Sequence, residues 1–151
     1  MHASSMMSEN SPEVRGDMAR TRAKAKGRRE SGTFIAIPHA VVNHDNYRSL
    51  KPRSVKLLID LCNQIKRGPN GYSNNGDLTT AWSVISKSGW TSRDQLHKAQ
   101  VELEEKGFIV KTRQGGRLLC NLYAVTFYAI DECGGKLDVA PTAAAPGNWK
   151  N

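Results

Sequence analysis

The residues best suited to chemistry stand close together between positions 91 and 98. They are side chains that donate or accept hydrogen bonds, several of them basic: Thr91, Ser92, Arg93, Gln95, His97 and Lys98. Arginine can bind guanine through two parallel hydrogen bonds, and glutamine can bind adenine in the same way. Arg93 is therefore the best candidate for reading a guanine, and Gln95 could read an adenine. A plain solvated helix could carry the same residue types.

A second polar and basic group flanks the pair Gly115-Gly116: Lys111, Arg113, Gln114 and Arg117. Two glycines can supply the positive φ angles of a hairpin turn. Lysine and arginine at a hairpin tip bind phosphates, which orients a protein on DNA without reading its sequence. The alternative is a hairpin whose cations are simply solvated.

A third group forms a cationic stretch without acids near the N-terminus: Arg20, Arg22, Lys24, Lys26, Arg28 and Arg29. Residues 1–32 lack a periodic apolar pattern, so we expect this segment to be disordered. It could lie along phosphates or enter a minor groove, or it could be a solubilising leader. If about three to six of its charges neutralise phosphates, log affinity should fall against log salt with a slope of about 3 to 5.

The element that would present residues 91–98 is a helix. Ser92 is a good N-cap, and Gln95 completes the pattern of a capping box. The apolar residues Leu96, Ala99 and Leu103 recur at helical spacing and define the buried face. Gly107 is suited to the position after the last turn, because glycine adopts a left-handed backbone without steric cost.

The sequence after Gly107 favours a β-hairpin. Residues 108–110 are Phe-Ile-Val, which is typical of a strand. The returning strand would draw on the apolar residues Leu118, Leu119, Leu122, Tyr123, Val125 and Phe127. A short strand over residues 77–79, after the turn residues of the loop 68–76, would begin the same sheet.

Other stretches predict supporting elements. Pro52 begins a strong amphipathic helix, and residues 39–47 predict a shorter helix preceded by a β-prone stretch at 34–37. Thr80 could cap a helix from Ala81 to about Lys87. Trp90 would fill the gap between that helix and the next one.

The pattern from Ser92-Arg93 through Leu96, Ala99, Leu103 and Gly107 to Phe108-Ile109 resembles the recognition helix and first wing strand of bacterial winged-helix regulators, the GntR-type ones among them. The block from about 34 to 131 is similar to small winged-helix proteins carried on phages, plasmids and genomic islands. The resemblance implies an α+β fold: a winged helix-turn-helix with a three-helix core, a small antiparallel sheet and a β-hairpin wing.

This interpretation divides the chain into three parts. Residues 1–32 would be the disordered basic arm, residues 33–132 the winged-helix domain, and residues 133–151 a flexible tail rich in Ala and Pro. The formal charge of +8, from 22 Lys and Arg against 14 Asp and Glu, favours nucleic acid as the partner over an anionic membrane.

Composition and motifs argue against several other classes. Apolar runs are too short to span a bilayer, and the N-terminus lacks the apolar segment of a secretory signal. Three widely spaced cysteines favour reduced thiols in a cytosol. The four histidines do not cluster with cysteines or acids at metal-ligand spacing, and no nucleophile elbow or phosphate-cradling loop is present. We therefore expect neither an enzyme nor a bound metal or cofactor.

The sequence thus predicts a protein that binds double-stranded DNA and acts as a transcriptional regulator, located in the bacterial cytoplasm at the nucleoid. A plasmid or phage replication initiator or accessory factor is one alternative. A winged-helix module for protein interaction, or an architectural factor, is another. A homodimer also stays open, because either the helical region before residue 50 or the C-terminal tail could pair.

Overall fold

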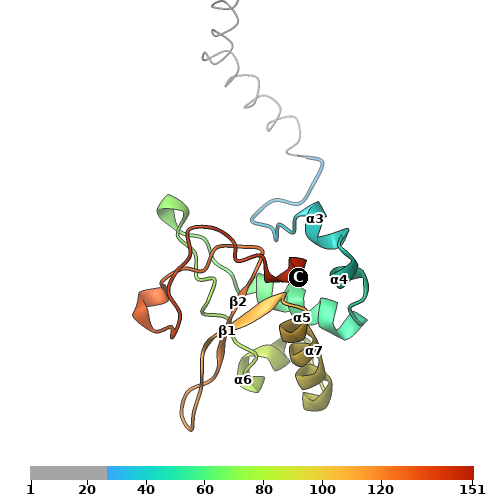
Figure 1. Ribbon diagram of the computed structural model, residues 1–151. Coiled ribbons are helices and arrows are strands. Elements are labelled where there is room, and N and C mark those ends of the chain that lie inside the picture. Colours follow the sequence, from blue (N-terminus) through green and yellow to red (C-terminus); the bar gives the residue numbers. More distant parts are fainter. Residues whose placement is uncertain (1–26) are drawn as a thin grey trace, which may run out of the picture. The chain divides into compact units, whose positions relative to one another are not determined.

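The computed structural model describes residues 27–151, apart from the side chain of Asn70 (Figure 1). The chain divides into two compact units, Met1–Phe34 and Ile35–Asn151. Within the first unit, Arg28 and Arg29 are exposed, and the guanidinium of Arg29 lies over the ring of Phe34 at 5.2 Å from its centre. Four residues of the basic arm that we expect at the N-terminus fall outside the described residues: Arg20, Arg22, Lys24 and Lys26.

The second unit is an α+β domain, as the sequence predicts. Its helices are α3 (His39–Val42), α4 (Asp45–Arg48), α5 (Pro52–Asn63), α6 (Trp82–Ile85) and α7 (Arg93–Glu105). Short 3-10 turns are η2 (Pro69–Gly71), η3 (Ser86–Ser88), η4 (Cys133–Gly135) and η5 (Asn148–Lys150). The strands β1 (Ile109–Arg113) and β2 (Leu122–Val125) form a two-stranded antiparallel sheet.

Helices α5 and α7 pack together, and each contributes a row of apolar side chains to the core. The apolar stripe of α5 buries Leu57, Leu58 and Leu61 completely, because these residues recur on one helical face. From α7, Ala99 and Leu103 are completely buried. The predicted inward face of α7 is thereby confirmed.

The hairpin follows α7 directly. Gly107 has a φ of 79°, and the N–H of Phe108 donates to the carbonyl of Leu103, which ends the helix and turns the chain into β1. Ile109 pairs with Val125 and Val110 with Ala124, and the register shifts between Lys111 and Arg113. The strand expected at residues 77–79 is reduced to a single antiparallel bridge between Leu78 and Tyr123.

Several predicted boundaries are wrong. Leu118 and Leu119 do not belong to the returning strand, which begins only at Leu122; they stand on the loop between the strands. The stretch 34–37 forms no strand, and residues 39–47 contribute to two short helices, α3 and α4, separated by Asn43 and His44.

The helix expected from Ala81 to Lys87 is shorter than predicted and has a different N-terminus. Thr80 does not cap it, since its hydroxyl donates to Oε1 of Gln100 at 2.8 Å, while the hydroxyl of Thr79 accepts from the N–H of Ala81. The α-helical part ends at Ile85 and tightens into η3, after which Gly89 turns the chain with a φ of 96°.

Residues 133–151 differ from the flexible tail that we expect, because they pack along the domain. Trp149 is 7 % exposed, and its carbonyl accepts from the side-chain amide of Asn46 at 2.8 Å. The ring of His44 meets Trp149 edge-on, with 5.3 Å between ring centres. Two residues before Trp149, the N–H of Gly147 donates to the carbonyl of Thr126. The buried indole therefore anchors a segment whose composition suggests disorder.

The loop 68–76 is held by a buried asparagine. The amide nitrogen of Asn75 donates to the carbonyls of Val125 and Ala129 at 3.0 and 2.9 Å, and its oxygen accepts from the N–H of Val125 at 2.9 Å. Because these bonds satisfy polar groups that would otherwise be buried without partners, they fix the loop to β2. The loop therefore serves the fold. No helix between residues 27 and 151 combines the length and apolar character needed to cross a membrane.

Candidate nucleic-acid interface

The first turns of α7 expose almost all of the polar side chains that the sequence singles out. Ser92 is half-buried, and the others are exposed: Thr91, Arg93, Gln95, His97 and Lys98. The hydroxyl of Ser92 accepts from the N–H of Gln95 at 3.2 Å, which confirms it as the N-cap. A capped helix end is rigid, so these side chains project from a fixed backbone.

Arg93 is held by an aromatic side chain of α6. Its guanidinium carbon lies 5.0 Å from the centre of the Trp82 ring, the geometry of a cation–π contact. The stacked guanidinium keeps its hydrogen-bond donors at its edge, which matches the planar fork that binds guanine or phosphate. Trp82 therefore orients Arg93. Sequence spacing alone gives no signal for this pair, because the two residues lie on different helices.

Gln95 does not complete a capping box. Its Oε1 accepts from the guanidinium of Arg53 on α5 at 2.8 Å, so the side chain turns toward α5 and away from the backbone of Ser92. The amide nitrogen of Gln95 stays available for a partner at this exposed position. Arg53 thus joins the candidate interface as a residue that the sequence analysis misses, since only the packing of α5 on α7 brings it there.

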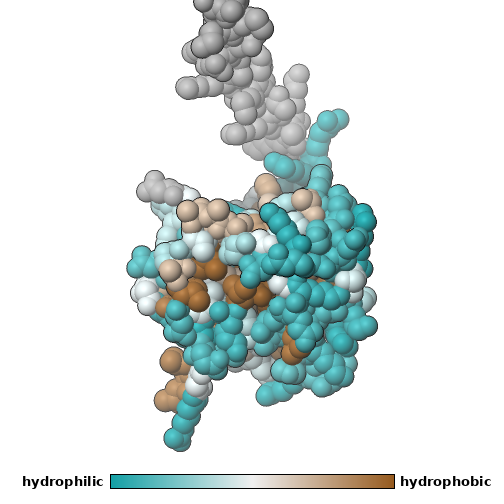
Figure 2. Space-filling view, viewed as in Figure 1, coloured by the Kyte–Doolittle hydropathy of each residue, from teal (hydrophilic) through white to brown (hydrophobic). Residues whose placement is uncertain are grey.

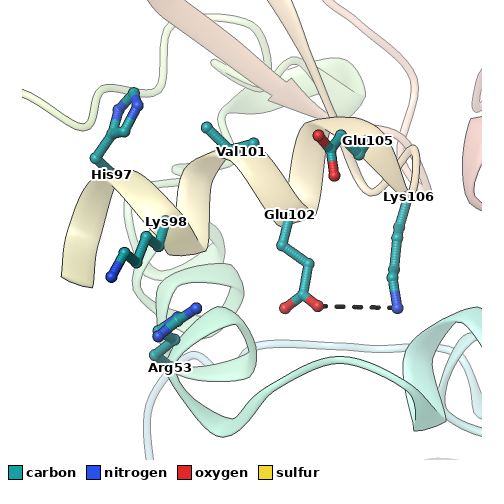
Figure 3. Close-up of a pocket in the computed structure, with 7 residues that line it drawn as sticks. All are labelled: Arg53, His97, Lys98, Val101, Glu102, Glu105 and Lys106. Carbon is teal, nitrogen blue, oxygen red and sulfur yellow. Dashed lines mark ion pairs between the residues drawn. The ribbon is translucent and has the colours of Figure 1, made fainter. Parts of the chain in front are cut away.

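Lys98 forms an ion pair within the helix, 2.9 Å from the carboxylate of Asp94. Both side chains are more than half exposed, and pairs of this kind at i,i+4 spacing contribute only about 0.3–0.5 kcal/mol. A phosphate can therefore compete for Lys98. His97 is exposed as well, and it points away from Arg53, whereas Lys98 points toward Arg53 (Figure 3).

A shallow hollow of about 390 Å³ runs beside α7 (Figure 3). It is lined by Arg53, His97, Lys98, Val101, Glu102, Glu105 and Lys106. Arg53, His97 and Lys98 lie at the end of the hollow near the start of α7. Both of its carboxylates belong to the C-terminal half of α7, where Lys106 also lines the hollow. An anionic polymer would therefore meet a basic lining near the start of α7 and a mixed lining, with Glu102, Glu105 and Lys106, near its end.

Glu102 holds α7 against the start of α5. Its Oε1 accepts from the hydroxyl of Ser54 at 2.5 Å and from the N–H of Lys51 at 3.0 Å, which ties α7 to the start of α5. Burial of the carboxyl opposes ionisation, but these hydrogen bonds and nearby Lys106, 3.8 Å away, together lower the pKa of Glu102. Glu102 is therefore ionised, and its carboxylate already accepts hydrogen bonds from Lys51 and Ser54.

The hairpin presents a second basic surface. From Lys106 to Ile130 the sequence contains four Lys and Arg residues and neither Asp nor Glu. Lys111 and Arg117 are exposed. The guanidinium of half-buried Arg113 donates to the carbonyl of Cys120 at 3.0 Å, so this side chain braces the two sides of the loop. Gln114 is exposed and accepts from the ammonium of Lys111 at 3.3 Å.

Figure 1 places the N-terminal end of α7 and the hairpin tip toward the same side of the domain, with α6 between them. Trp90 lies behind this surface, 7 % exposed, and its indole N–H donates to the carboxylate of Asp60 at 2.8 Å. The side chain is thus buried and bonded to α5, and it does not offer a face for base stacking.

Other kinds of site find little support among residues 27–151. There, no group of three His, Cys, Asp or Glu side chains lies close enough to hold a metal ion. Burial raises the pKa of the Cys62 thiol to about 12, which disfavours the reactive thiolate at neutral pH. Comparison with known proteins gives no matching family model, no matching curated protein and no matching solved structure.

Proposed function

We propose that the chain binds double-stranded DNA as a winged helix-turn-helix protein and acts as a transcriptional regulator in the bacterial cytoplasm, at the nucleoid. In this proposal α6 and α7 are the helix-turn-helix, α7 is the recognition helix, and the β1–β2 hairpin is the wing. DNA is the partner, and neither catalysis nor a cofactor is part of the activity.

The observation that carries the proposal is the exposed cationic start of α7 beside an acid-free hairpin. A recognition helix contacts bases mainly through its N-terminal residues, and these are the residues that α7 exposes around Arg93. The stacking of Arg93 on Trp82 pre-orients the guanidinium, so less conformational entropy is lost when it binds. The hairpin cations would hold phosphates beside it.

An architectural role is the second candidate, and the state of two side chains favours it. Gln95 is bonded to Arg53, and Lys98 is paired with Asp94. If both contacts persist on DNA, Arg93 is the main side chain left to read a base. Binding would then depend on charge and DNA shape more than on sequence.

Selection of bound duplexes from a random DNA pool separates these possibilities. The regulator proposal predicts an enriched motif. Arg93→Ala should then lower affinity for it by about 1 to 3 kcal/mol and relax preference at one base pair. Arg48→Ala, which removes the same charge from α4, is the matched control and should leave the motif intact. Binding without enrichment would favour the architectural role, and no binding to any duplex at low salt would refute both.

A further inference from the structure

The loop between β1 and β2 carries two large aliphatic side chains into solvent. Leu118 is 92 % exposed and Leu119 is 59 % exposed. Figure 2 shows apolar atoms on the loop between β1 and β2, which projects from the domain, and hydrophilic atoms at the end of this loop. Neither leucine contributes to the core, so the fold does not explain why this loop carries two exposed apolar side chains.

The loop is built to hold these side chains in place. The N–H of Gly116 donates to the carbonyl of Leu119 at 2.9 Å, and the N–H of Gly115 donates to Oδ1 of Asn121 at 2.5 Å. A Cβ at Gly115 would collide with the backbone of residues 119–121, so the two sides of the loop approach as closely as glycine permits. With Arg113 bonded to Cys120, the tip is a braced turn.

The charges of the hairpin indicate which kind of surface this loop binds. Arg117 precedes the two leucines directly, Lys111 and Arg113 stand behind them, and the hairpin has no acid of its own. One carboxylate from outside the hairpin contacts it near this loop: Oδ2 of Asp138 accepts from the N–H of Gln114 at 2.8 Å. A loop that carries exposed apolar side chains next to cationic ones complements a surface that is anionic outside and apolar within.

The small area of the two leucines favours DNA over a protein as the partner. A stable protein–protein interface buries about 1,200–2,000 Å², which is more than two leucines on a narrow loop can supply. A wedge that enters a base-pair step needs only one or two apolar side chains, and leucine is among the residues that proteins use in this way. The flanking cations can meanwhile bind the phosphates on either side of the step.

From this geometry we propose that Leu118, supported by Leu119, inserts between two base pairs in the minor groove and kinks the duplex. The inference rests on the proposed DNA binding and adds a mode of DNA deformation to it. Pyrimidine–purine steps such as TA are the easiest to unstack, so the wedge should favour duplexes that place such a step under the hairpin.

The test uses the full chain and a 30-base-pair duplex with one central TA step, labelled at its ends with a donor and an acceptor dye. A second copy carries 2-aminopurine beside that step to report unstacking. The wild type should bend the duplex, within the range of about 20–90° that apolar wedges produce, and should raise the 2-aminopurine fluorescence. Leu118→Ala should bind with an affinity within about tenfold of wild type while both signals fall by at least half.

Val139→Ala is the matched control, because Val139 is also an exposed aliphatic residue but lies outside the hairpin; it should bend DNA as the wild type does. Wild-type binding without bending or unstacking would overturn the wedge and leave the proposed function standing. Equal bending by Leu118→Ala would also overturn it. Failure of the wild type to bind the duplex at low salt would refute both. Leucine-dependent binding to vesicles with 30 % phosphatidylserine, without bending of the duplex, would assign the tip to a lipid surface.

Discussion

At the scale of single residues, several side chains fix how the helices and loops pack, because they join elements that are distant in sequence. Asn75 bonds to Val125 on β2, and Glu102 bonds to Ser54 on α5. The ring of Trp82 on α6 contacts the guanidinium of Arg93 on α7. Local spacing does not reveal such contacts, since each depends on how two elements pack. Ser92 and Gly107 were predictable because a cap and a helix stop depend on only a few neighbouring residues.

Glu102→Gln should lower the free energy of unfolding at pH 7 by about 1–3 kcal/mol, because hydrogen bonds to an ionised group are the stronger ones. The folded state lowers the pKa of Glu102 below its ordinary value of 4.5. Its contribution is therefore fully present above about pH 4.5 and is lost as pH falls through the lower folded-state value. The difference between variant and wild type should shrink below that pH.

Urea unfolding between pH 3 and 7 measures this difference. Glu105→Gln, a change on the exposed side of the same helix, is the control and should alter stability little. A Glu102→Gln variant whose deficit stays constant across this pH range would show that the carboxylate charge does not link α7 to α5.

At the scale of elements, α7 and the existence of a hairpin follow from the sequence, but the limits of the hairpin do not. Leu118 and Leu119 have the strand preference of the residues that follow them, and apolar pattern alone assigns them to β2. The structure starts β2 at Leu122, because Gly115, Asn121 and Arg113 close a wider loop. The same misassigned leucines give the hairpin loop its exposed apolar side chains.

Within this hairpin the basic residues should differ in effect. Arg117→Ala should weaken binding to all duplexes by a similar factor and lower the slope of log affinity against log salt by about 1, since it would remove one phosphate contact. Affinities measured by fluorescence anisotropy at several salt concentrations, with Arg48→Ala as the charge-matched control, give this slope. An unchanged slope for Arg117→Ala would exclude Arg117 from the interface.

At the scale of the whole molecule, the segment 133–151 is where composition misleads most. Its Ala and Pro content is typical of a disordered tail, yet the buried indole of Trp149 packs against His44, and its carbonyl is bonded to Asn46 on α4. Gly107 also belongs to this contact, because a Cβ there would strike the backbone of Asn148. One buried aromatic residue can outweigh the flexibility of its neighbours.

Trp149→Ala should therefore destabilise the domain by about 3–5 kcal/mol, the usual cost of removing a buried aromatic side chain. Chemical unfolding followed by circular dichroism measures this loss, and Val139→Ala on the exposed side of the same segment should cost far less. Wild-type stability of Trp149→Ala would mean that the segment does not pack against the domain in solution.

The central claim is that the start of α7 and the hairpin together contact a DNA duplex. Amide chemical shifts of the isotope-labelled full chain, recorded while a duplex is added, test it residue by residue. DNA contact through both elements should give shifts concentrated at residues 91–98 and 111–119, with α4 unaffected. Shifts that concentrate on α3 and α4 while residues 91–98 stay unchanged would contradict it.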